Sequence, residues 1–369
     1  MADRLYLDHA ATTPMRPVAR QALTDALTRW ANPSSPHHEG RVARAALEDA
    51  RTRVRSAYGW KGECIFTSGA TEAIQIALAR GDSEGCLVSS VEHDAVLRAA
   101  TKADRLAVGG DGLVDLAALD VKLAEIGEEP LVAVQWGNNE TGVLQPLAAI
   151  AERVHARSGL LVVDAAQMPV GWDDGDLPVD HADMIAVSGH KRGGPPGIGA
   201  LFVRDLAHLR PSGGQERGYR GGTENVPGAI AFAAALCAPE DIEGMAELRA
   251  MLDQGVEAAG GTVIARASPR NPAIGSYRMP GTSAAAQLIR FDMAGIAVSA
   301  GAACSSGSMR PSHVLAQMGI DSAAAGEVVR VSFGLDTSEE DVERFVEQWS
   351  AIAHATRDAP TPDLGPTLA

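Results

Sequence analysis

The stretch LVAVQWGNNETGVLQPLAAIAERVHARSGLLVVDAAQ, residues 131–167, contains two short apolar runs separated by a polar turn and a helical pattern. The runs are LVAVQW at 131–136 and LLVVDA at 160–165. Short runs of β-branched and aliphatic residues that are bounded by turn signals predict buried strands. A strand, a helix and a second strand in succession predict a parallel βαβ unit.

The same alternation occurs on both sides of this stretch. We expect each of the flanking apolar runs to be a strand that is followed by a turn and a longer helical pattern. These runs are CIFTS at 64–68, CLVSS at 86–90 and MIAVSGH at 184–190. The repeated pattern predicts an α/β fold with a mostly parallel sheet.

The pattern changes from about residue 262, where short strands mix with helices. The strand-like runs are TVIARAS at 262–268, IGSYRMP at 274–280, GIAVSAG at 295–301 and VVRVSFG at 328–334, and the helical runs are 312–319 and 338–356. This mixture predicts a smaller α+β domain, with a boundary near 240–260. The tail 358–369 has three prolines, and we expect it to be disordered or loosely docked.

Composition excludes several classes of protein. The chain has 369 residues, of which 46% are hydrophobic and 21% charged, as in globular proteins of two or three units. Its net charge of -15 argues against nucleic-acid binding. No apolar stretch is long enough for a membrane span and no signal peptide is recognisable, so we expect a cytoplasmic protein.

The four cysteines form no metal-binding or disulfide pattern, because they lack CxxC spacing and nearby histidines. We therefore expect no metal site. Three of them, Cys64, Cys86 and Cys237, lie in apolar runs and are expected to fill the core.

Ligands of parallel sheets bind beyond the carboxyl ends of the strands, so the residues there are candidates for a site. Gly69, Ala70 and Thr71 open a helix and offer free N–H groups and a hydroxyl to a phosphate, although an ordinary helix cap gives the same pattern. His93 could stack on a ring or move a proton, or it could simply begin a helix.

Two further strand ends carry charged side chains. Asp164 ends an apolar run, where a carboxylate is costly unless it meets a cation or a strong donor, and Gln167 follows three residues later. A helix cap is the alternative for Asp164. Lys191 follows Ser188 and His190 in a glycine-rich bend, where partial desolvation would prepare it as a Schiff-base nucleophile. A solvated surface lysine is the alternative.

Taken together, these parts suit pyridoxal phosphate (PLP). A phosphate cradle, a histidine able to stack on a ring, an acid for the pyridinium nitrogen and a lysine for the aldehyde are what this cofactor requires.

The chain resembles the cysteine desulfurases of the PLP-dependent fold type I superfamily, in their long-loop class of nitrogen-fixation and housekeeping iron-sulfur enzymes. The segments that carry the resemblance are YLDHAATTP (6–14), NPSSPHHEG (32–40), FTSGATEA (66–73), EHDAV (92–96), NNETGVLQP (138–146), VDAAQ (163–167), SGHKRGGPPGIGAL (188–201), GGQERGYRGGTENV (213–226) and SAGAACSSGSMRPSHVL (299–315). They span nearly the whole chain.

The resemblance implies a role for each candidate. Lys191 would bind PLP covalently, Asp164 would pair with the pyridinium nitrogen, His93 would stack on the ring and Gln167 would face the phenolic oxygen. The residues implied for the phosphate are Ala70, Thr71, Ser188, His190 and, from a second subunit of a homodimer, Thr223. Asn139 would lie near the phenolic oxygen and the substrate, and Arg330 would bind the substrate carboxylate.

Cys304 lies in a run of small residues, 299–308, that predicts a mobile exposed loop. The resemblance implies that its thiolate takes sulfur from L-cysteine to give alanine and a persulfide, with His93 and Lys191 moving protons. The sulfur would pass to an acceptor such as an iron-sulfur scaffold protein. The resemblance also implies a large sheet of seven strands within a PLP-binding domain at 13–250, and a small domain formed by 1–12 and 251–369.

Two other functions stay open from the sequence. A selenocysteine lyase or an aminotransferase of the same fold would share the cofactor site, but Cys304 in its loop argues against a transaminase. A non-catalytic binding or scaffold protein would be expected to lose Lys191 or Cys304, and both are present.

Overall fold

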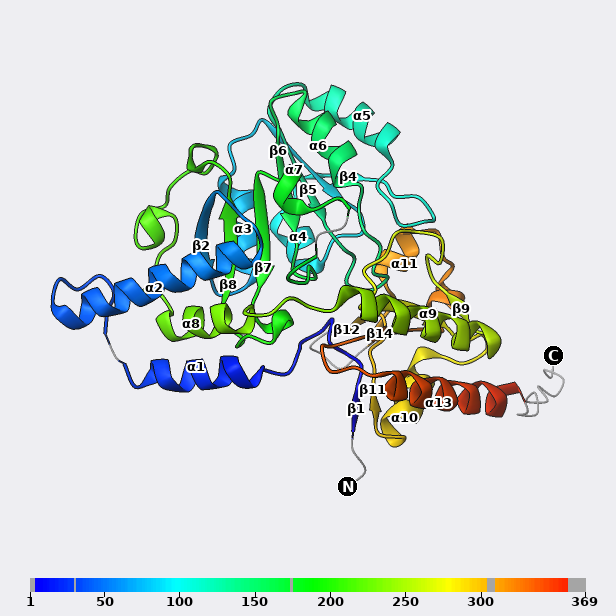
Figure 1. The fold of residues 1–369 in the computed structure, drawn as a ribbon. Coiled ribbons are helices and arrows are strands. Elements are labelled where there is room, and N and C mark those ends of the chain that lie inside the picture. The colour runs from blue at the N-terminus through cyan, green and yellow to red at the C-terminus, as the bar shows by residue number, and fades with distance from the viewer. Residues whose placement is uncertain (1–3, 30, 173–174, 304–308, 358–369) are drawn as a thin grey trace, which may run out of the picture.

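The computed structural model describes residues 4–29, 31–172, 175–303 and 309–357. Figure 1 shows two groups of elements side by side, a larger one around a broad sheet and a smaller one that holds the last helices of the chain. In the larger group the strands are β2 (Glu63–Thr67), β3 (Gly85–Ser89), β4 (Asp104–Leu106), β5 (Pro130–Gln135), β6 (Leu160–Asp164), β7 (Met184–Ser188) and β8 (Gly199–Val203). The helices are α1 (Pro17–Leu27), α2 (His38–Ala57), α3 (Ala70–Arg80), α4 (Asp94–Ala99), α5 (Leu116–Ile126), α6 (Leu147–His155), α7 (Pro178–His181) and α8 (Val226–Ala235).

The larger sheet has, among the described residues, seven strands in the order β2-β8-β7-β6-β5-β3-β4. Neighbouring strands are parallel except for β8, which runs antiparallel to both β2 and β7. The predicted α/β fold with a mostly parallel sheet is confirmed, and all five predicted strands of this half are present.

The two faces of the sheet pack against different helices. Along β5, Val132 and Val134 point into the core that includes residues of α2, α5, α6 and α8, whereas Leu131 and Ala133 point into the core that includes residues of α3 and α4. This follows from the two-residue side-chain period of a strand. Burial on both faces explains why β5 is apolar up to Gln135.

The helix predicted after the run MIAVSGH is absent among the described residues. β6 is followed only by the four-residue α7, and β7 is followed by a 3-10 turn at His190–Arg192 and then by strand β8. The sequence between β7 and β8 is GHKRGGPPGI, in which Gly193 and Gly197 have positive φ, so a helix cannot continue there.

The smaller group has its own hydrophobic core. Its strands are β9 (Thr262–Val263), β10 (Ile274–Arg278), β11 (Ile296–Ala297), β12 (Ala302–Ala303), β13 (Met309–Arg310) and β14 (Val328–Ser332). Its helices are α9 (Ile242–Ala258), α10 (Ala284–Met293), α11 (His313–Gln317), α12 (Ser322–Ala325) and α13 (Glu339–Arg357). Phe291 and Phe345 stack at its centre with 5.0 Å between ring centroids.

The predicted mixture of strands and helices in this half is confirmed, although β9 is shorter than the predicted run. The run TVIARAS leaves the sheet after Val263 because the chain turns at Ala265, whose φ is +52°. No helix among the described residues is long and apolar enough to cross a bilayer.

The N-terminal strand β1 (Leu5–Tyr6) belongs to the smaller group. It pairs in parallel with β11, with Leu5 opposite Ile296 (Figure 1). The domain boundaries at 13–250, 1–12 and 251–369 stay a prediction, and the tail 358–369 lies outside the described residues.

The prediction that three cysteines fill the core is wrong for Cys237. Cys64 is buried and Cys86 is partly buried, but Cys237 is exposed. It lies just beyond the end of α8, after the buried Leu236, where the chain leaves the core. Its apolar neighbours belong to the helix, not to the turn that follows it.

Candidate active site

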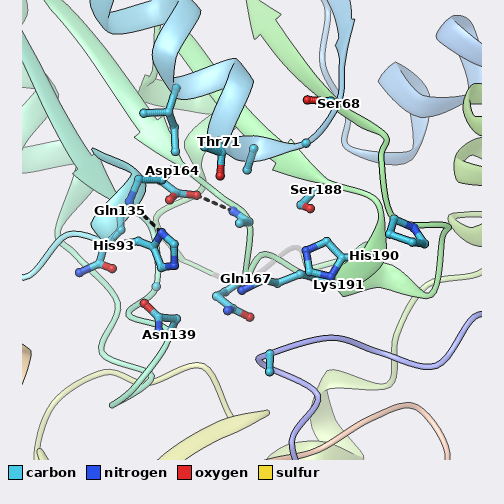
Figure 2. Close-up of a pocket in the computed structure, with 18 of the residues that line it drawn as sticks. Ser68, Thr71, His93, Gln135, Asn139, Asp164, Gln167, Ser188, His190 and Lys191 are labelled. Carbon is cyan, nitrogen blue, oxygen red and sulfur yellow. Dashed lines mark hydrogen bonds between the residues drawn. The ribbon is translucent and has the colours of Figure 1, made fainter. Parts of the chain in front are cut away.

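A cavity of about 420 Å³ opens at the carboxyl edge of the large sheet. Figure 2 shows Asp164, His93, Gln167 and Lys191 around one space, with the hydroxyls of Thr71 and Ser188 facing it from another side. The described residues that line the cavity are Ala11, Ser68, Gly69, Ala70, Thr71, Ile74, His93, Ala95, Gln135, Gly137, Asn139, Asp164, Ala166, Gln167, Ser188, His190, Lys191, Pro196 and Gly197. Nine of the sequence-predicted site residues are thus brought together: Ala70, Thr71, His93, Asn139, Asp164, Gln167, Ser188, His190 and Lys191.

Lys191 lies in the 3-10 turn after β7 and extends its amine into the cavity. Its Nζ donates a hydrogen bond to the carbonyl oxygen of Ala10 at 2.8 Å. Burial, assisted by the positive charge of Arg330, lowers the pKa of Lys191 to about 8 from its ordinary 10.5. At mildly alkaline pH a substantial share of this amine is therefore unprotonated, which is the form that attacks a carbonyl carbon.

Asp164 lies at the end of β6 and His93 follows β3, two strands of the large sheet that β5 separates. Asp164 ends β6 and accepts a hydrogen bond from the N–H of Ala166 at 3.0 Å, so it caps a turn and not a helix. His93 precedes α4, and its Nδ1 accepts from the N–H of Ala95 at 3.1 Å. The two interpretations of His93 are therefore compatible, since it begins a helix and also lines the cavity.

Protonation of His93 follows from these contacts. Burial lowers its pKa, and the negative charge of Asp164 opposes this effect only in part. Because Nδ1 accepts a backbone hydrogen bond, the proton of the neutral ring is on Nε2. His93 can thus present an uncharged ring to a ligand and a single N–H at its edge.

The start of α3 forms a cradle suited to an anion. Its N-cap is Gly69, and no side chain caps the helix, so its first N–H groups remain available to a ligand. Gly199 packs against this turn, and a Cβ at Gly199 would lie 2.6 Å from Gly69 Cα. Glu72 closes the turn from its other side, because its Oε2 accepts from the N–H of Ser68 at 2.6 Å.

His190 and Gln167 each contact the N-terminal segment. His190 Nδ1 lies 3.1 Å from the Thr12 hydroxyl, and burial lowers the pKa of His190. Gln167 Nε2 donates to the carbonyl of Ala10 at 3.0 Å. Its Oε1 is buried and has no partner among the described residues, so the cavity wall retains one unused polar atom.

The other three predicted site residues do not line the cavity within the described chain. Arg330, on β14, lies beside it and donates to the carbonyl oxygen of Asn139 at 2.9 Å. Thr223 is exposed on the loop that precedes α8. Cys304 lies outside the described residues.

The N-terminal residues that meet Lys191 carry no predicted role. Ala10 and Ala11 belong to YLDHAATTP, which the resemblance included, but a backbone carbonyl has no signal of its own in a sequence. Gln135, which also lines the cavity, was missed, although it ends a predicted strand.

The chain belongs to the class-V aminotransferase family, whose model matches residues 5–345. Its similarity to curated cysteine desulfurases is extensive: it is 37% identical to that of Cereibacter sphaeroides, over 96% of this chain and 97% of that protein. The resemblance to cysteine desulfurases is confirmed.

Solved structures agree with this assignment. The X-ray structure of a NifS-like protein from Rickettsia africae matches with a TM-score of 0.84 and 28% identity, over 95% of this chain and all of that one. A structure described as SspA in complex with cysteine matches with a TM-score of 0.77 and 27% identity, over 90% of this chain and all of that one.

Proposed function

We propose that the chain is a PLP-dependent cysteine desulfurase, which removes sulfur from L-cysteine and leaves alanine. The observation that carries this proposal is the convergence of Lys191, Asp164 and the anion cradle at Gly69 to Thr71 on one cavity. The amine is desolvated, the carboxylate faces it across the space, and the helix start is uncapped. An aldehyde, a pyridinium nitrogen and a phosphate are the three groups of PLP that these features fit.

Each lining residue then has a role toward the cofactor. Lys191 would bind its aldehyde carbon covalently, and Asp164 would hold the proton of the ring nitrogen. His93 would stack on the ring and Gln167 would face the phenolic oxygen. The residues that would hold the phosphate are Ala70, Thr71, Ser188, His190 and the Thr223 of a second subunit in a homodimer. Bound PLP would supply an electron sink for bond changes at the α-carbon of an amino acid.

The chain's own residues would carry out the remaining chemistry. Arg330 and Asn139 would orient the carboxylate of the amino acid. Lys191 Nζ would move the proton of the α-carbon. His93 would take the proton of the substrate thiol at Nδ1, once that nitrogen gives up its hydrogen bond from the Ala95 N–H. The Cys304 thiolate would bond to the substrate sulfur as the carbon–sulfur bond breaks, so that the sulfur stays on Cys304 as a persulfide. The electron pair of the broken bond would pass to the β-carbon, which takes up a proton to become the methyl group of alanine.

We also propose that the chain forms a homodimer and passes its sulfur to an acceptor protein. The homodimer is supported by the exposed position of Thr223, which is not among the described residues that line the cavity of its own chain. Transfer of the persulfide sulfur to an iron-sulfur scaffold protein is supported by the NifS-like and IscS-like names of the relatives. A cytoplasmic location stays a prediction from the sequence.

The experiment is a comparison of the wild type with Cys304→Ser in the presence of PLP and L-cysteine. We expect wild-type protein to release alanine and to carry one added sulfur atom on the Cys304 peptide, measured by mass spectrometry. Cys304→Ser should bind PLP and L-cysteine, seen as changes in absorbance, but form no persulfide. Cys64→Ala is the matched control and should retain persulfide formation.

Other outcomes would contradict the proposal in distinct ways. A keto acid as the product would identify an aminotransferase. Full sulfur release by Cys304→Ser without an added thiol would identify a lyase that expels the chalcogen directly, as a selenocysteine lyase does.

A further inference from the structure

Asp8 and Arg330 form an ion pair at the edge of the cavity. Arg330 Nη2 donates to Asp8 Oδ1 at 2.6 Å, and both side chains are largely buried, with exposed fractions of 9% for Arg330 and 21% for Asp8. Asp8 follows β1 and forms an isolated parallel bridge with Ser332, two residues beyond Arg330 on β14. The backbone therefore fixes this carboxylate beside the guanidinium.

The donors of Arg330 are only partly used. Nη1 donates to the carbonyl oxygen of Asn139, and Nη2 donates to Asp8. Nε is buried and has no hydrogen-bond partner among the described residues. A guanidinium has five N–H groups in a rigid plane, so two fixed contacts determine the direction in which the others point. Without Asp8, only the Asn139 carbonyl would orient the side chain.

Asp8 also begins the segment that crosses from Arg330 to Lys191. Two residues later the Ala10 N–H donates to the Ser332 hydroxyl at 2.9 Å, and the Ala10 carbonyl accepts from Lys191 Nζ. Thr13 then contacts the turn of Lys191 through its N–H and its hydroxyl. Residues 8–13 thus connect Arg330 with Lys191, because Asp8 is hydrogen-bonded to Arg330 while Ala10 and Thr13 are hydrogen-bonded to Lys191.

Charged side chains of both signs surround Lys191. Two positive groups lower the pKa of Lys191 in addition to burial, and two negative groups raise it. The groups that face it are Arg330, Arg192, Asp164, Asp8, His93 and His190. Arg192 is paired with Glu240 at 2.9 Å, so Arg330 is the cation whose field on Lys191 depends on Asp8.

We propose that Asp8 is a positioning residue, which orients Arg330 for the carboxylate of the substrate and screens Lys191 from the charge of Arg330. The inference rests on the proposed function, since it assigns the Arg330 guanidinium to substrate binding. Position and charge can be separated, because an asparagine at residue 8 keeps the oxygen that accepts from Nη2 but lacks the negative charge.

The experiment uses PLP-loaded protein and the variants Asp8→Asn and Asp8→Ala. The first readout is the pH midpoint of the visible absorbance of bound PLP, which follows the protonation of the lysine nitrogen. We expect both variants to lower this midpoint by about one pH unit, because each exposes the nitrogen to an uncompensated cation.

The second readout is the KM for L-cysteine. It should rise about tenfold or more in Asp8→Ala, where a charge-assisted hydrogen bond no longer fixes the guanidinium, and should not rise in Asp8→Asn. Asp292→Asn is the matched control, since Asp292 forms an exposed ion pair with Arg4 in the same half of the molecule. It should leave both readouts unchanged.

The inference is overturned if Asp8→Asn, the variant closest in shape to the wild type, keeps the wild-type absorbance midpoint, or if Asp8→Ala keeps the wild-type KM. A wild type that binds no PLP or releases no alanine would overturn the proposed function, and the inference with it. A functional wild type with indistinguishable variants would overturn the inference alone.

Discussion

Replacing Lys191 with methionine should stabilise the protein when PLP is absent. The pKa of Lys191 is lowered to about 8 from its ordinary 10.5, chiefly by burial. Since each unit of difference is worth about 1.4 kcal/mol, the charged amine opposes folding by about 3 kcal/mol at pH 7. Methionine removes this cost but also the hydrogen bond from Nζ to the Ala10 carbonyl, which is worth about 1 kcal/mol. The expected net gain is therefore about 2 kcal/mol at pH 7.

The gain should depend on pH with a definite sign. A lysine whose pKa is lowered by folding binds fewer protons in the folded state, so its cost is complete below pH 8 and disappears as the pH rises toward 10.5. At pH 9.5 only about 1 kcal/mol of the cost remains, which the lost hydrogen bond offsets. The stabilising effect of Lys191→Met should thus be close to zero at that pH.

Urea unfolding of the PLP-free wild type and variant at pH 7 and pH 9.5 measures the effect. Lys61→Met is the matched control, because Lys61 is exposed and its amine remains in water after folding. It should show no difference between the two pH values. A Lys191→Met variant that is less stable than wild type at pH 7, or equally stabilised at both pH values, would refute the reasoning.

Two further changes test other parts of the site. Asp164→Asn should keep the fold but lower turnover by orders of magnitude and weaken PLP binding, since an amide cannot hold the ring proton; near-normal alanine release would contradict that role. Gly199→Ala should impair PLP retention, because the added Cβ would meet Gly69 Cα at 2.6 Å and displace the anion cradle. Dialysis of the loaded protein followed by absorbance measures the loss, and unchanged retention would show that the cradle tolerates the methyl group.

The sheet and most of its site could be predicted from local sequence. β2, β3, β5, β6 and β7 are short apolar runs that end in polar residues, and parallel strands bring those ends to one edge. His93, Asp164 and Lys191 were therefore recognisable as candidates from their positions alone. The order of the strands in the sheet then determines how far apart these three side chains lie.

Other features depend on contacts that no local pattern encodes. The hydrogen bond from Lys191 to the Ala10 carbonyl joins residues 181 positions apart and involves a backbone atom on one side. The exposure of Cys237 depends on where α8 ends, which its apolar neighbours conceal. The sequence pattern did not predict strand β8. Its antiparallel direction follows from the glycines and prolines in the loop before it, and its own composition does not indicate that direction.

The pairing of β1 with β11 has a consequence for synthesis on the ribosome. Leu5 and Ala10 emerge before their partners, because Ile296, which pairs with Leu5, and Ser332, which holds Ala10, come almost 300 residues or more later. Closing so long a loop is slow and costs entropy before any contact compensates for it. The large sheet can form while the N-terminal segment is still unpaired, because all of its strands precede residue 204. A nascent chain that stops before residue 296 would then have a folded sheet but no Ala10 carbonyl held at Lys191 and no Arg330 to pair with Asp8, so these contacts form only after residues 296–332 are made.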